Sequence, residues 1–319
     1  MSLRLEMLQV ARLAPKLLGE SAELVRDFLL RQQNPDGGFK DRTGQSDLYY
    51  TVFGLDGLLA LEVPSSKFQV PSGDSAERIA QAARYLAGFG CGEALDFVHV
   101  CCLARARAAV GSTNQRSAEL VRTDREILRC LEKFRSQDGG YKPVTGAECG
   151  TAYGGFLALG AYQDLKAELP EPLRLVQSLK LLETDDKAWA NELPPRSALR
   201  TPKSAVGSTN ATAAAATLLR NLSQPVNPAV GDWLLARCHS QGGFLAMPNA
   251  PMPDLLSTAT ALHALAGLQV DCSAVKERCL DFVDSLWTNE GGFHGSWADE
   301  VLDCEYTFYG LLALGHLSL

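Results

Sequence analysis

The sequence lacks any apolar run long enough to cross a bilayer, because its 319 residues hold no stretch of 18 or more consecutive apolar residues. It also lacks a surplus of positive charge: 30 Lys and Arg stand against 37 Asp and Glu, for a net charge of -7. A nucleic-acid surface needs clustered basic residues to displace the counterions of phosphate. We therefore predict no transmembrane segment and no nucleic-acid partner.

Several catalytic and targeting signals are missing as well. The sequence contains no phosphate-binding loop, no glycine-rich dinucleotide motif, no nucleophile elbow and no CxxC pair among its nine cysteines. Residues 1–21 are apolar in part, but Arg4, Glu6, Arg12 and Lys16 interrupt them, so they do not read as a secretory signal. We expect an amphipathic N-terminal helix, a cytoplasmic location, no cofactor and no bound metal.

What the sequence does contain is an internal repeat. Gly-Gly-aromatic triplets occur at intervals of 102, 103 and 49 residues, which are two, two and one periods of about 50 residues. Degenerate copies are then expected near residues 88 and 190. The four clear triplets are residues 37–39, 139–141, 242–244 and 291–293.

Each repeat has the same internal order. An amphipathic segment such as 21–33 comes first, a Gly-Gly turn ends it, and a segment that is apolar on all sides, such as 51–61, follows a short polar loop. A helix that is apolar on every side is buried on every side. Six such pairs predict an all-α protein, an α/α toroid of six helical hairpins in two concentric rings. We expect one domain over residues 1–319, with an N-terminal helix at 1–19 and six repeats over 20–319.

Five of the six buried segments align on a threonine, and a polar residue stands four positions before the aligned position in every segment except the third. The aligned positions are Thr51, Val100, Thr151, Thr212, Thr258 and Thr307, preceded by Asp47, Asp96, Ala147, Ser208, Asp254 and Asp303. An Asp or Ser in this place is typical of a helix N-cap, where its oxygen accepts free backbone N–H groups. Parallel inner helices would put all of these caps around one mouth of the toroid.

The Gly-Gly-Phe turns and the D-x-x-x-T pattern resemble the β subunits of protein prenyltransferases, most closely the geranylgeranyltransferase type II group, and more widely the terpenoid-cyclase toroids. The resemblance covers nearly the whole chain. It implies a zinc site made by Asp and Cys in a D-x-C opening the fifth inner helix and by a His just before the Thr of the sixth. Here Asp254 is kept, but Leu256 stands where the Cys belongs and Tyr306 where the His belongs.

The resemblance also implies a diphosphate site, with an Arg and a Lys in the loop before the fifth inner helix and basic residues on neighbouring helices. The corresponding loop, 244–254, has no Lys or Arg, and the matching inner-helix positions carry Cys149 and Asn210. We therefore expect both the zinc and the diphosphate site to be missing. A relocated metal site at His99 and Cys149 stays open as an alternative, and so does the weak likeness of residues 183–186 (ETDD) to the DxDD acid of type II terpene cyclases.

These patterns lead to a hypothesis of a toroid that binds an isoprenoid or another apolar ligand in its central cavity. If the protein is an enzyme, a desolvated carboxyl would act as general acid. The candidate catalytic residues are Asp254, Asp303, Glu305 and Tyr306. The residues predicted to surround the cavity are Asp47, Tyr50, Asp96, His99, Cys149, Asn210, Asp254, Leu256, Asp303 and Tyr306.

Three other functions remain open from the sequence. The chain could be a working prenyltransferase β subunit that needs a separate α subunit, or a terpene-cyclase-like enzyme. It could also be a non-catalytic module that binds a partner protein. In that case large side chains would fill the cavity, and the candidates are Tyr49, Tyr50, Phe97, Phe308 and Tyr309.

Overall fold

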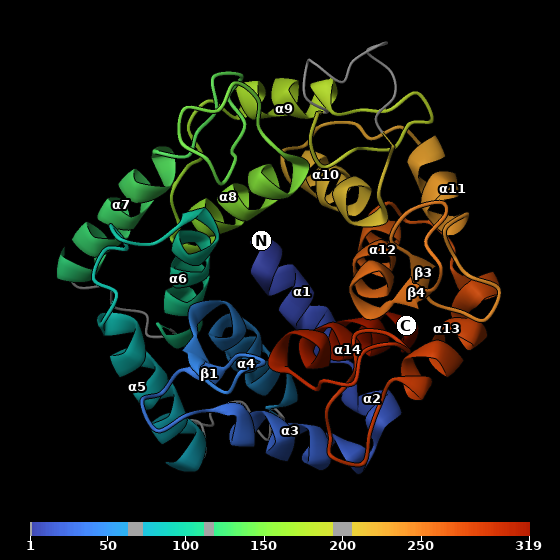
Figure 1. The fold of residues 1–319 in the computed structure, drawn as a ribbon, viewed down its shortest axis with the longest axis horizontal. Coiled ribbons are helices and arrows are strands. Elements are labelled where there is room, and N and C mark those ends of the chain that lie inside the picture. The colour runs from blue at the N-terminus through green and yellow to red at the C-terminus, as the bar shows by residue number, and fades with distance from the viewer. Residues whose placement is uncertain (1, 63–72, 112–117, 194–205) are drawn as a thin grey trace.

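The structure is a computed structural model that describes residues 2–62, 73–111, 118–193 and 206–319. Two concentric rings of helices make up this part of the chain, as Figure 1 shows, so the predicted α/α toroid is confirmed. The inner ring contains α4 (Leu48–Leu61), α6 (Phe97–Val110), α8 (Ala152–Asp164), α10 (Thr209–Asn221), α12 (Leu255–Gly267) and α14 (Cys304–Leu317). The outer ring contains α3 (Ser21–Gln32), α5 (Gly73–Ala87), α7 (Ala118–Glu132), α9 (Pro172–Leu181), α11 (Ala229–Leu235) and α13 (Ser273–Ser285).

The rings follow from the difference between the two kinds of helix. Along α3, for example, only Val25, Phe28 and Leu29 are buried, which is the one-sided pattern of an outer helix. Along α10, by contrast, every residue from 211 to 219 is buried. Each inner helix contacts the next, and α14 contacts α4, so the inner ring is closed. No described helix is both long and apolar enough to cross a membrane.

The two repeated motifs join each inner helix to the turn before it. Thr51 Oγ1 accepts the backbone N–H of Phe39 at 2.9 Å and donates to the Asp47 carbonyl at 2.6 Å. Thr258 does the same for Phe244 and Asp254 in the fifth repeat. The aromatic rings of these turns are fully buried under the inner helices. The chain therefore repeats both motifs because each hairpin needs the same junction.

The first glycine of the turn has a further role, which is to contact the next outer helix. Gly37 has φ +97°, and a Cβ there would collide with the carbonyl of Gln81 on α5. Gly291 has φ +92°, and a Cβ there would collide with the carbonyl of Leu24 on α3, which is how the last repeat packs against the first. Only glycine allows both the positive φ and this close backbone approach.

Four short strands form two hairpins in these loops: β1 (Phe39–Lys40) pairs with β2 (Ser46–Asp47), and β3 (Phe244–Leu245) pairs with β4 (Pro253–Asp254). The degenerate copy expected near residue 190 is at 187–189, because Trp189 makes the bridge to Glu183 that Phe39 makes to Gln33. Lys187 replaces the first glycine there at φ +68°.

Two details of the sequence alignment need correction. Helix α8 is capped by Thr151, whose Oγ1 accepts the Gly154 N–H at 2.9 Å, so Thr151 is equivalent to the caps and Ala147 lies outside the helix. Residues 1–19 also form two helices, α1 (Leu3–Ala11) and α2 (Pro15–Leu18), where one was expected. Helix α1 lies inside the inner ring, against α14, α4 and α8 (Figure 1).

Candidate functional site

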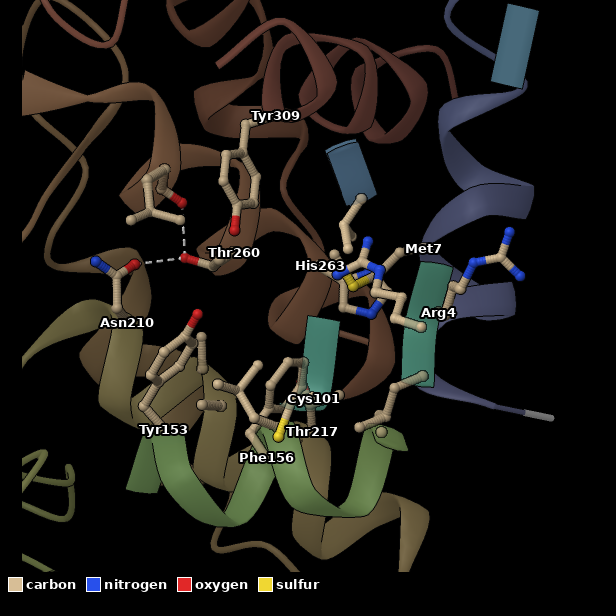
Figure 2. Close-up of a pocket in the computed structure, with 18 of the residues that line it drawn as sticks. Arg4, Met7, Cys101, Tyr153, Phe156, Asn210, Thr217, Thr260, His263 and Tyr309 are labelled. Carbon is tan, nitrogen blue, oxygen red and sulfur yellow. Dashed lines mark hydrogen bonds between the residues drawn. The ribbon is translucent and has the colours of Figure 1, made fainter. Parts of the chain in front are cut away.

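A cavity of about 390 Å³ lies between α1 and the N-terminal ends of the inner helices. Residues from all six inner helices and from α1 line it, and most of their side chains are apolar (Figure 2). Phenylalanine and tyrosine rings make up much of the wall, with small residues such as Gly160 and Ala214 between them. The volume falls in the range of ligand pockets, about 300–1,000 Å³.

The inward positions follow the helical period from each cap. Once α8 is aligned on Thr151, the sixth residue after every cap lines the cavity. This ring consists of Phe53, Cys102, Leu157, Ala214, Thr260 and Tyr309. Positions two and nine after the caps add Tyr49, Tyr153, Asn210 and Leu256 nearer the mouth and Arg105, Gly160, Thr217, His263 and Leu312 further in. A period of 3.6 residues places these positions on one face.

The mouth of the cavity is the end at which the inner helices begin, and the polar side chains that line the cavity there are uncharged. Thr260 Oγ1 lies 2.7 Å from Asn210 Oδ1 and 2.8 Å from the Leu256 carbonyl. Figure 2 shows the hydroxyls of Tyr153 and Tyr309 pointing into the same space as Thr260. Tyr309 is 8% exposed, whereas Tyr153 is 41% exposed and faces the cavity.

A carboxyl with an unusual pKa lies behind this wall. Glu305 is hydrogen-bonded to the hydroxyl of Tyr49 at 2.6 Å, and Tyr49 lines the cavity. Burial raises the pKa of Glu305 to about 7, although the Tyr49 hydrogen bond acts in the opposite direction. Burial also raises the pKa of Asp303 and of Asp254. Glu305 is therefore partly protonated at neutral pH and can exchange a proton next to the cavity.

Arg42 places a positive charge beside the capping carboxylate of Asp303 at the mouth. Its guanidinium contacts Asp303 at 2.8 Å and Asp299 at 2.7 Å and lies over the ring of Tyr306. Arg42 belongs to the loop before α4, far from the loop that the family pattern indicated, so the sequence alone did not reveal it. Two carboxylates share this one cation, so the group keeps a negative charge when both acids are ionised.

The floor of the cavity is a cluster of buried charges that sequence reasoning missed. Arg4 of α1 donates to Asp56 at 2.7 Å, and Arg105 of α6 contacts the other oxygen of Asp56 at 2.8 Å. Asp164 also lines the floor, and burial raises its pKa to about 6 against the opposing charges of Arg4 and Arg105. Asp56 and Arg105 sit within largely apolar inner helices, and Asp164 is the last residue of another, α8. This unusual position was the only signal available in the sequence.

Two histidines complete the floor. His263 Nδ1 lies 3.1 Å from His316 Nε2, and its other nitrogen lies 3.7 Å from Glu6, which pairs with Arg220. Burial lowers the pKa of His263 to about 4 and that of His316 to about 3. Both rings are therefore neutral at physiological pH.

Of the ten residues predicted to surround the cavity, Asn210 and Leu256 form part of its wall. Asp47, Asp96, Asp254 and Asp303 cap their helices, as their spacing predicted. The remaining four, Tyr50, His99, Cys149 and Tyr306, lie outside the lining, as do the candidate catalytic residues Asp254, Asp303 and Glu305. Among the residues suggested as filling, Tyr49 and Tyr309 line the cavity, while Phe97 and Phe308 are buried elsewhere.

The alternative sites at His99 and at residues 183–186 have local structural contacts. His99 lies between two caps, 2.8 Å from Asp96 and 3.3 Å from Asp47, and these carboxylates raise its pKa although burial acts to lower it. Asp186 accepts the indole N–H of Trp233 at 2.7 Å in the turn after α9. Within the described residues, no three His, Cys, Asp or Glu side chains are grouped to hold a metal ion.

Comparison with known proteins defines the class and then the family. A variant of the type II terpene cyclase MstE from Scytonema, in complex with geranylgeranyl dihydroxybenzoate, has a TM-score of 0.59 at 15% identity, covering 96% of this chain and 97% of that chain. Candida albicans protein geranylgeranyltransferase-I complexed with GGPP has a TM-score of 0.62 at 13% identity, covering 93% of this chain and 90% of that chain. At these identities the likeness shows the fold, a toroid of the prenyltransferase and terpene cyclase kind.

The family follows from the sequence. The prenyltransferase alpha-alpha toroid domain matches residues 11–81 and 187–317, which is more than half of the chain, so the protein belongs to this family. A search of curated protein sequences gives no match.

Proposed function

We propose that the protein binds an isoprenoid or a similar apolar lipid in its central cavity and does not carry out zinc-dependent transfer from a prenyl diphosphate. The observation that carries this proposal is the apolar cavity inside the inner ring, walled by aromatic rings. Burying a lipid chain there would contribute about 25 cal/mol for each Å² of apolar surface removed from water. The toroids of similar fold support the ligand class, because their complexes contain geranylgeranyl compounds.

The residues at the mouth argue against a diphosphate. Leu256 and Tyr306 occupy the places of two zinc ligands, and Arg42 is already held by Asp299 and Asp303. A diphosphate would have to displace these carboxylates or lie beside them, which electrostatics disfavours. A neutral lipid has no such cost.

Thermal unfolding with geranylgeraniol and with geranylgeranyl diphosphate, in metal-free buffer, tests this proposal. A ligand that binds only the folded state raises the melting temperature by mass action, and we expect the alcohol to raise it more. Gly160→Leu should abolish the shift, because it adds a side chain inside the cavity, where a Cβ at Gly160 meets only Leu3, at 4.0 Å. Ala229→Leu, at the exposed start of α11, is the control and should keep the shift. A larger shift with the diphosphate would favour a prenyltransferase β subunit instead.

Glu305 favours a second candidate function, which is isomerisation or cyclisation of the bound isoprenoid. A carboxyl with a pKa of about 7 that is hydrogen-bonded to a cavity phenol can act as a general acid at neutral pH. Protonation of an alkene followed by loss of a proton would give an isomer of unchanged mass. Chromatography of the incubated alcohol would reveal such an isomer, and Glu305→Gln should prevent its formation.

A further inference from the structure

Two tyrosines at the mouth of the cavity have hydroxyls that point into it. Tyr153 of α8 and Tyr309 of α14 come from opposite sides of the inner ring, and Figure 2 shows their hydroxyls pointing into the same part of the cavity. Tyr309 is more than nine-tenths buried. Within the described part of the chain, neither hydroxyl makes a hydrogen bond to the protein. A buried tyrosine hydroxyl normally has a partner.

Three other polar side chains at this level already have partners. Thr260 bonds to Asn210 and the Leu256 carbonyl, and Tyr49 bonds to Glu305. Asn210 in turn donates to Ser257 at 3.3 Å. The two phenols are thus donors that a ligand can engage here without breaking a contact in the protein. A ligand that covers these hydroxyls without accepting a hydrogen bond would leave them unpaired, which weakens its binding free energy.

The chemistry of the two groups restricts what that acceptor can be. Burial raises the pKa of both phenols, and the charge of Glu305 adds to this effect, so both keep their protons and act as donors. Both arginines that line the cavity, Arg4 and Arg105, are paired with Asp56. A neutral oxygen with lone pairs fits this environment, whereas an anion would lie near Glu305 without a free counter-charge.

We propose that Tyr153 and Tyr309 bind a neutral acceptor oxygen of the ligand, so that the ligand class is an oxygenated lipid with a hydroxyl, ether or carbonyl group near the mouth. This inference rests on the proposed lipid-binding function and goes further, because it separates oxygenated lipids from plain hydrocarbons.

The test compares three probes with the same chain: geranylgeraniol, its methyl ether and the corresponding hydrocarbon. The Tyr153→Phe/Tyr309→Phe double variant should bind the alcohol and the ether about tenfold more weakly than the unmodified protein, as expected for two lost hydrogen bonds. The hydrocarbon should bind the variant equally well or more tightly, because no donor is then left unpaired. Tyr162→Phe is the matched control on α8, since the Tyr162 hydroxyl bonds to Glu132 and lies outside the cavity lining.

The outcomes separate this inference from the proposed function. If none of the three probes binds the unmodified protein, both fail. If the probes bind and the double variant treats all three as the unmodified protein does, lipid binding stands and the role of the two phenols is wrong. Tyr153→Phe alone changes a partly exposed side chain, so it provides a second variant if the double variant does not fold. We expect this single variant to bind the alcohol and the ether about threefold more weakly than the unmodified protein.

Discussion

The mouth and the floor of the toroid differ in how their charges are arranged: carboxylates cap the helices at the mouth, whereas the floor combines Arg4 and Arg105 with Asp56 and Asp164. The six inner helices are parallel, so the positive ends of their dipoles meet at the mouth and the negative ends at the floor. Four aspartates cap helices at the mouth, whereas Arg105, Arg107 and Arg220 lie toward the other ends of theirs. The mouth repeats one residue type at one position, but the floor is built from residues that occur once each.

The mouth and the floor also differ in how far apart in the sequence their interacting residues lie. A cap satisfies backbone groups within three residues of itself, so its signal is local. The floor depends on pairs far apart in the chain, such as Arg4 with Asp56, and on a helix that enters the ring from outside the repeat. Changes at the floor should therefore have larger and less local effects than changes at the mouth.

The largest effect is expected for Asp56→Ala. Asp56 is fully buried and holds both Arg4 and Arg105, so its removal leaves two charges without their partner. Breaking a buried pair in this way costs about 3–5 kcal/mol. Urea denaturation followed by circular dichroism measures the loss. A change below about 1 kcal/mol would mean that α1 does not hold the floor together.

Much of the mouth could be predicted from the sequence, and little of the floor could. The Gly-Gly-aromatic spacing predicted the rings, and the Asp residues before the inner helices predicted the caps at Asp47, Asp96, Asp254 and Asp303. The alignment failed at α8 because Thr151 is a cap there, while threonine elsewhere stands four residues later. No repeat includes α1, so its ion pairs with α4 (Arg4 with Asp56) and α10 (Glu6 with Arg220) had no pattern from which they could be predicted.

An intermediate effect should appear in the pH dependence of stability, with one buried carboxyl at each end. The pKa of Asp164 at the floor is raised to about 6 and that of Glu305 behind the mouth to about 7. Each folded-state pKa is above the unfolded value of about 4, so each group favours the folded state at low pH and this contribution is lost as pH rises through the raised pKa. The loss is on the order of 3 kcal/mol for Asp164 and about 3–4 kcal/mol for Glu305.

Denaturation between about pH 4 and about pH 8 would resolve the two groups. Asp164→Asn should remove the part of the decline that ends near pH 6, and Glu305→Gln the part that ends near pH 7. The double variant should keep the opposite contribution of His263 and His316, whose lowered pKa values make stability rise with pH up to about 6.5. If neither variant changes the profile, the two carboxyls are better hydrated than their burial indicates.

The smallest effect is expected at the caps, where the mouth can be altered one helix at a time. Thr151→Ala removes the side-chain acceptor of the Gly154 N–H and should cost about 1 kcal/mol, as a lost N-cap does. Ala147→Asp is the matched test of the alignment: residue 147 precedes α8 and caps nothing, so the added carboxylate should leave stability unchanged. If Ala147→Asp stabilises the protein, residue 147 is the cap position of α8 after all, and Thr151 is equivalent to Thr51 as the sequence alignment predicted. Neither variant should move the pH at which Asp164 titrates, because a cap acts on its own first turn while the floor lies at the far end of the helix.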